Sequence, residues 1–117
     1  MITEPIKWGP AARARDEGIQ QAADHAGPDW KVMASLALYN YALTHSRFLI
    51  EDVRVYADKH GVEAPPDARA WGAVTQGAIR AGFIERDGYA PARSSHLSPK
   101  PVWKSLIASK ALMERQQ

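Results

Sequence analysis

Residues 67–104 decide the fold; they read DARAWGAVTQGAIRAG and then FIERDGYAPARSSHLSPKPVWK. The first part predicts a helix over 67–82. Asp67 can cap its start, because a carboxylate accepts hydrogen bonds from the first free backbone N–H groups. Gly82 can end it, because glycine takes positive φ at little cost. The expected buried side recurs at helical spacing and consists of Trp71, Val74, Ala78 and Ala81.

The second part predicts an irregular β-ribbon directly after the helix. A strand begins at Phe83, and Asp87-Gly88 is a strong turn dipeptide. Pro91 and Pro99 are expected to exclude regular pairing between the two strands, because proline has no N–H to donate. Residues 101–103 form the returning strand, with Trp103 as its anchor in the core.

The opposite side of the 67–82 helix is a candidate DNA-binding surface. It carries two guanidinium groups, one amide and a small residue: Arg69, Ala73, Gln76 and Arg80. A small residue lets a helix sit deep in a groove, and Arg and Gln bind base edges or phosphates. The loop between the strands adds hydroxyls and cations suited to phosphate oxygens: Arg93, Ser94, Ser95, His96 and Lys100. The alternative is an ordinary solvated helix face.

Charge is unevenly distributed along the chain. Residues 69–104 hold six Lys or Arg and two acids, whereas residues 1–68 have a net charge of −3. A local basic segment favours binding of a polyanionic partner at that segment, without making the whole protein bind polyanions non-specifically. The excess is modest, so charge alone leaves the solvated-face interpretation open.

The 117 residues have a globular composition, with 45% apolar residues, 24% charged residues and four Trp. No apolar run approaches the roughly 20 residues of a membrane span, and no signal-peptide pattern is visible. The absence of Cys excludes disulfides and thiolate metal sites, and it fits a cytoplasmic location.

Three further helices are expected upstream, over about 11–25, 30–45 and 51–60, with a short strand over 47–49. Asp29 is the expected cap of the second helix. The expected packing residues of the three helices are Ile19, Ala22, Ala23 and Ala26; then Met33, Leu36, Ala37, Asn40, Tyr41 and Leu43; then Val53, Tyr56 and Ala57. The predicted class is mainly α with a small β-ribbon, as one domain over 11–105. An extension over 1–10, which contains Trp8, precedes it, and an amphipathic tail over 106–117 follows.

From residue 30 onward, the order is helix, strand, helix, turn, helix, strand, loop and strand, which is the order of a winged helix-turn-helix. The strings ARDEGIQQAADHA, EDVR, DARAWGAVTQGAIRAG and SSHLSPKPVW resemble small phage and prophage proteins of that type. The resemblance covers about residues 14–105. It implies a protein that acts in DNA metabolism and is encoded among replication and recombination genes, and it carries no catalytic residue. The chain departs from the pattern at Ile50, where a small polar cap would be expected before EDVR.

Motifs for catalysis, metals or cofactors are missing from the sequence. No HExxH, P-loop or GxGxxG occurs, and the four His have no metal-ligand spacing. His25, His45 and His60 fall near helix ends, where contact with the last carbonyls is the expected role.

We therefore predict a non-enzymatic protein that binds double-stranded DNA, with no cofactor. A protein-interaction adaptor for a host or phage replication or defence protein, or a homodimer, is the alternative. A metal-dependent nuclease using Asp52 or Asp58 is a third, weaker hypothesis.

Overall fold

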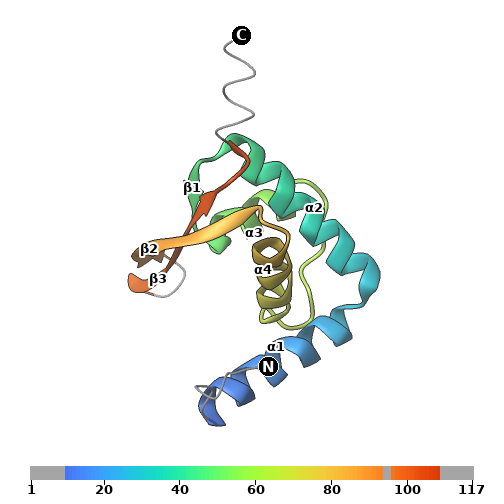
Figure 1. The fold of residues 1–117 in the computed structure, drawn as a ribbon. Coiled ribbons are helices and arrows are strands. Elements are labelled where there is room, and N and C mark those ends of the chain that lie inside the picture. Colours follow the sequence, from blue (N-terminus) through green and yellow to red (C-terminus); the bar gives the residue numbers. More distant parts are fainter. Residues whose placement is uncertain (1–9, 94–95, 109–117) are drawn as a thin grey trace.

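The computed structural model describes residues 10–93 and 96–108 and has an α+β architecture (Figure 1). In these residues it contains four helices, α1 (Pro10–Ala26), α2 (Pro28–Thr44), α3 (Ile50–Lys59) and α4 (Ala70–Arg80). The strands β1 (Arg47–Phe48), β2 (Ile84–Ala92) and β3 (Ser98–Ser105) form one antiparallel sheet in the order β1-β3-β2. The predicted mixture of helices and a small sheet is thus confirmed. None of the described helices is long and apolar enough to cross a membrane.

The first turns of the helices are capped differently from the prediction. Helix α2 begins immediately after Gly27, whose φ is 88°, with Pro28 in its first turn, so Asp29 lies inside the helix instead of capping it. In α3, the carboxylate of Asp52 accepts a hydrogen bond from the backbone N–H of Leu49 at 2.9 Å. This bond from inside the first turn explains why the helix tolerates Ile50 where a polar cap was expected.

Helix α4 starts later than predicted. Backbone hydrogen bonds from Ala70 to Asp67 and from Trp71 to Ala68 form a tight turn before the regular helix. The carboxylate of Asp67 accepts the N–H of Arg69 at 2.9 Å inside that turn. Asp67 therefore satisfies one free N–H, but the helix itself begins at Ala70. Its predicted end is confirmed, since Gly82 has a φ of 80°.

Helix α2 buries only part of the side that was predicted, since Ala37 is buried and Tyr41 and Leu43 are partly buried. Its buried residues are Ala34, Ala37, Leu38 and Ala42. Met33, Leu36 and Asn40 are exposed instead. The helix is apolar on nearly all sides, so periodicity could not indicate which side faces α3 and α4. The three alanines allow the neighbouring backbones to approach closely, and this decides the side that is buried.

The β-ribbon is more regular than predicted. Asp87-Gly88 forms a bulge between Arg86 and Tyr89, not a turn, and β2 continues to Ala92. Pro91 lies opposite Pro99, and the ladder passes through both. Prolines fit here because a pair that exchanges no N–H···O bond needs no donor. On its other edge β3 pairs with β1 only at Trp103 and Lys104.

The core lies between α2, α3, α4 and the sheet. The largest fully buried side chains are Leu38, Val53, Val74 and Ile84. Trp71 and Trp103 belong to the same cluster, which confirms the prediction that they anchor helix and ribbon. The Trp71 ring meets Trp30 edge-on, with ring centroids 5.3 Å apart. The other predicted inward residues of α3 and α4 are buried or partly buried, except that Ala81 is exposed.

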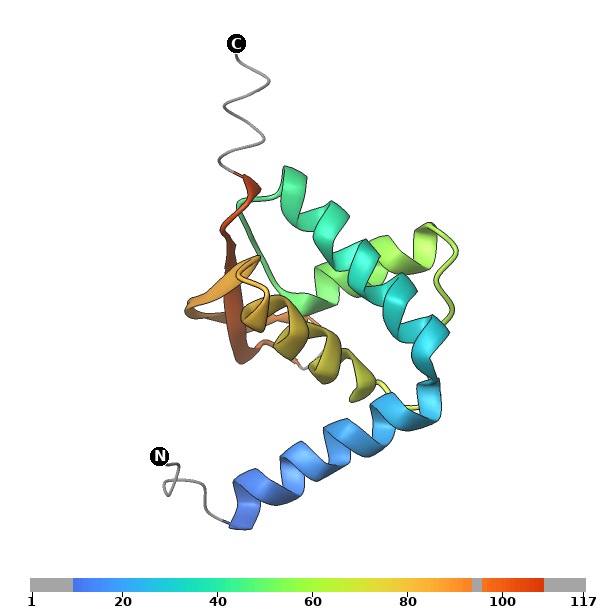
Figure 2. The same cartoon turned by 45° about the vertical axis from the view of Figure 1, so that its right-hand side comes forward.

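Helix α1 lies outside this core and packs across α4, away from β1 (Figures 1 and 2). Ala22 and Ala23 are buried, as predicted. A Cβ on Gly72 of α4 would come within 3.0–3.1 Å of the Ile19 side chain, so α1 and α4 meet where α4 has no side chain. This contact determines which part of α4 stays accessible.

A hydrogen bond of Ser105 joins the end of the sheet to α2. Its hydroxyl donates to the Ala42 carbonyl at 2.7 Å and accepts the N–H groups of Ile107 and Ala108. Beyond it, Leu106 is exposed and Ala108 is buried. The rest of the predicted tail and Trp8 lie outside the described residues.

Candidate nucleic-acid interface

The predicted DNA-binding stripe of α4 does not form one surface. Arg69 is exposed, but its guanidinium is held by Asp67, with Nη2 2.6 Å and Nε 3.0 Å from Oδ2. The hydrogen bonds and charge of Arg69 lower the pKa of Asp67, and the same pair raises the pKa of Arg69. Arg69 also rests on α1, because a Cβ on Gly18 would lie 2.7 Å from its Nη1. The guanidinium is therefore already engaged within the protein.

Ala73 was predicted to face a groove, and this prediction is wrong. Its side chain is only 5% exposed. Helix α1 packs on this part of α4, next to the contact between Ile19 and Gly72. A small residue at this position serves close helix packing, not access to DNA.

The two remaining residues of the stripe, Gln76 and Arg80, lie in different surroundings. Gln76 is exposed and lines a hollow of about 650 Å³, together with Ile79, whereas Arg80 is exposed but does not line it. Thr75 also lines this hollow; it is buried and donates its hydroxyl hydrogen bond to the Trp71 carbonyl at 2.9 Å. Only the middle of the predicted stripe therefore opens onto a concave surface.

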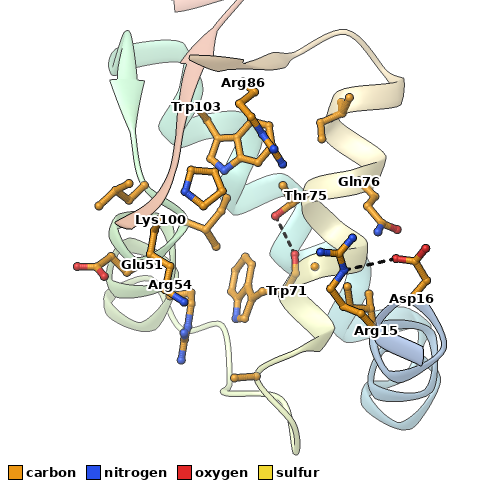
Figure 3. Close-up of a pocket in the computed structure, with 17 residues that line it drawn as sticks. Arg15, Asp16, Glu51, Arg54, Trp71, Thr75, Gln76, Arg86, Lys100 and Trp103 are labelled. Atoms are coloured by element: carbon orange, nitrogen blue, oxygen red, sulfur yellow. Dashed lines mark hydrogen bonds and ion pairs between the residues drawn. The ribbon is translucent and has the colours of Figure 1, made fainter. Parts of the chain in front are cut away.

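Residues of three helices, α1, α3 and α4, and of two strands, β2 and β3, line this hollow, which we call the α4 hollow (Figure 3). Its cations are Arg15 from α1, Arg54 from α3, Arg86 from β2 and Lys100 from β3. Two carboxylates, Asp16 and Glu51, accompany them, so among the described lining residues positive charge exceeds negative charge two to one. Arg15 approaches Asp16 only weakly, with Nε 4.0 Å from Oδ1. The apolar part of the lining includes Ile19, Leu49, Ile50, Trp71, Ile79, Pro101 and Trp103.

Arg86 occupies a defined position in this wall. It pairs with Trp103 across the sheet, and its guanidinium carbon lies 5.5 Å from the centroid of that ring. Its Nη1 also donates to the Tyr89 hydroxyl at 3.2 Å, and the Tyr89 ring is 5.8 Å away. Contacts on two aromatic rings hold the cation over the hollow without neutralising it.

Three cations of the α4 hollow, Arg15, Arg54 and Arg86, were not predicted from the sequence. They come from three elements far apart in the chain, and no local motif connects them. Of the predicted site residues that the structure describes, only Gln76 and Lys100 line the α4 hollow.

The predicted DNA-binding residues of the loop do not lie together at one site either. Arg93 lines a second concavity of about 800 Å³ with Tyr41, His45 and Lys59. Burial and the charge of Asp52 raise the pKa of the Tyr41 hydroxyl in its wall. His96 is exposed, with a φ of 52°. Ser94 and Ser95 lie outside the described residues. The ribbon therefore contributes Lys100 and Arg86, not Arg93, to the α4 hollow.

The histidines in two helix ends have the roles expected from the sequence. Nδ1 of His45 lies 3.0 Å from the Tyr41 carbonyl, and Nδ1 of His60 lies 2.7 Å from the Tyr56 carbonyl. Each ring also stacks on the tyrosine of its own last turn. Within the described part of the chain, no group of three or more His, Cys, Asp or Glu is arranged to hold a metal ion.

Comparison with protein families, curated proteins and solved structures gave no match to this chain.

Proposed function

We propose that this protein is a winged-helix protein that binds DNA through the α4 hollow, without catalysing a reaction. The order of its elements from α2 onward and the sheet order β1-β3-β2 support the winged-helix interpretation. In this interpretation α3 and α4 are the helix-turn-helix, and β2 and β3 are the wing. The origin in a phage or prophage and the cytoplasmic location remain predictions from the sequence.

One observation carries the proposal: four cations from four separate elements surround one concave surface. Phosphate oxygens are bound by such side chains, and their convergence is what a polyanion needs. Gln76 adds an amide that can both donate to and accept from a base edge. The paired state of Arg69 and the buried state of Ala73 shift the expected contacts from the predicted stripe to this hollow.

The proposal is tested by the binding of a fluorescently labelled DNA duplex with a single-stranded overhang at several salt concentrations. We expect Arg54→Ala/Lys100→Ala to weaken binding and to flatten the salt dependence by about two, because each lost phosphate contact removes about one unit of slope. The control, Lys31→Ala/Lys59→Ala, removes the same charge from residues that do not line the α4 hollow. Weak binding by the wild type without salt dependence would refute the proposal.

A protein-interaction adaptor is the second candidate, and helix α2 favours it. Val32, Met33 and Leu36 are 58%, 48% and 52% exposed on one side of this helix. Apolar residues grouped on an exposed helix side are typical of contacts with another protein. Sedimentation analysis of the wild type and Leu36→Glu tests for self-association, and a wild type that stays monomeric at high concentration excludes the homodimer. Stable binding to a host protein, together with no affinity for DNA, would select the adaptor.

A further inference from the structure

The exposed part of α4 is unsuited to insertion into a DNA major groove. Proteins that read duplex DNA with a helix contact base edges through its N-terminal residues. In α4 these residues are Ala70, Trp71 and Ala73, all buried, and Gly72, which is partly exposed and lies against the Ile19 side chain. The first turn of α4 thus offers no long polar side chain to a groove, and α1 packs beside α4 (Figure 2).

What α4 offers instead is one wall of a hollow. The volume of about 650 Å³ falls within the range of about 300–1,000 Å³ that is typical of pockets for small ligands. A few nucleotide units match this size, whereas an intact duplex does not enter such a space. An occupant that enters the hollow is therefore narrower than a double helix.

The chemistry of the hollow fits unpaired nucleotides. Bases that are not paired stack on aromatic rings and on guanidinium planes. Arg86 lies on the Trp103 ring, and Tyr89 beside it is 61% exposed. Arg54 and Lys100 lie within reach of the same space and suit the phosphates between the bases (Figure 3).

We propose that the α4 hollow binds single-stranded DNA and that duplex DNA is the weaker ligand. The stacking platform is Arg86, which lines the hollow, together with Tyr89, which does not line it but contacts Arg86 and is exposed beside it. This inference rests on the proposed DNA-binding function and names the form of DNA. It replaces insertion of α4 into a groove by entry of a strand between α1, α3, α4 and the ribbon.

The test compares a labelled 12-nucleotide single strand with the blunt duplex of the same sequence, at one salt concentration. We expect the single strand to bind at least ten-fold more tightly. Tyr89→Ala should weaken single-strand binding about ten-fold, the loss that removal of one base–aromatic stack gives, and Tyr89→Phe should restore most of it. Duplex binding should change little in either variant.

A second variant fills the space directly. Ile79 lines the α4 hollow and is 42% exposed, so Ile79→Trp should block single-strand binding. Val32→Trp places the same ring on the exposed side of α2 and should bind as the wild type does. Lys100→Glu repeats the test without added bulk, and thermal unfolding establishes that each variant is folded.

The outcomes separate the two proposals. Equal or tighter binding of the blunt duplex, unaffected by Ile79→Trp, overturns the single-strand inference and leaves DNA binding in place. Absence of binding to both forms overturns both. Preference for the single strand that is lost in Ile79→Trp and Lys100→Glu supports both.

Discussion

The two flanks of α4 differ in the residues they carry and in what they contact. Towards α1, Gly72 lies against the Ile19 side chain, and the neighbouring Ala73 is buried, as are Ala22 and Ala23 of α1. Towards the sheet, the flank carries Gln76 and Ile79 and faces the cations of the α4 hollow. Small residues let two helices pack closely, whereas long polar residues keep a surface hydrated and accessible. The difference teaches that a helix face described as polar and small by sequence can be partly a packing interface and partly an accessible surface.

The largest expected effect comes from the residue that supports both flanks. Trp71 packs in the core against Trp30 and also lines the α4 hollow. Trp71→Ala should lower the free energy of unfolding by about 3–5 kcal/mol, because a large buried ring leaves a cavity. Urea unfolding measures this loss. Leu97→Ala, at a residue that is 65% exposed, should change stability by no more than about 0.5 kcal/mol. A loss below about 1 kcal/mol for Trp71→Ala would contradict its anchoring role.

The next effect tests the contact of α4 with α1, by the same substitution at two glycines of α4. Gly72→Leu must displace Ile19 and should cost about 1–3 kcal/mol. A Cβ on Gly77 would meet no neighbouring side chain or other element within 4 Å, so there is room for a larger residue. Gly77→Leu should therefore be neutral or stabilising by up to about 1 kcal/mol, through helix propensity. Both are measured by thermal or urea unfolding.

The contact between α1 and α4 has its own control. Ile19→Ala in the Gly72→Leu background should recover part of the lost stability, because it opens room for the new side chain. Equal costs at Gly72 and Gly77, with no recovery by Ile19→Ala, would contradict close packing of α1 on α4.

A smaller effect is expected in the open flank, where a cation serves binding more than stability. Arg86→Met should lower the free energy of unfolding by only about 0.5–1 kcal/mol, the size of an exposed cation–π contact. DNA binding should fall several-fold in the same variant. Arg80→Met removes a cation of α4 outside the α4 hollow and should leave binding nearly unchanged. Similar binding losses in both variants would show that only net charge matters.

The smallest effect concerns the exposed pair at the start of α4. Arg69 lowers the pKa of Asp67, so the carboxylate is charged more readily in the folded than in the unfolded protein. The stabilising contribution is therefore complete above the ordinary value of 3.8 and is lost as the pH falls through the lowered pKa. Asp67→Asn should be slightly less stable than the wild type at pH 7, and the two should converge in acid.

Urea unfolding at several pH values measures this convergence. Asp58→Asn removes an exposed carboxylate from α3, outside this pair, and is the control. A difference between wild type and Asp67→Asn that stays constant down to the lowest pH would contradict the charge-pair explanation.

Much of the local structure could be predicted from the sequence. The helices and the start of the strand that follows Gly82 were predicted to within a few residues, because proline, glycine and apolar spacing act over short distances. The inward positions of Trp71, Trp103 and Val53 were predicted for the same reason. The bulge at Asp87-Gly88 was not, because the same dipeptide suits a turn or a bulge, and only pairing with β3 distinguishes them.

The candidate site was predictable only in part. Gln76 and Lys100 were found because they lie beside a clear helix and a clear strand. Arg15, Arg54 and Arg86 were missed because convergence in space leaves no pattern in the chain. Ala73 was assigned to the wrong environment because the periodicity of one helix does not reveal that a second helix covers it.

The sequence by itself determined the order of helices and strands, the anchoring tryptophans and the basic character of the second half. These follow from interactions between residues that are close in the chain. Only the tertiary structure decided which side of α2 is buried, that α1 covers the start of α4, and that four cations from separate elements share one hollow. The physical reason is that burial depends on which surfaces meet, and surfaces from distant segments meet only when the whole chain has packed.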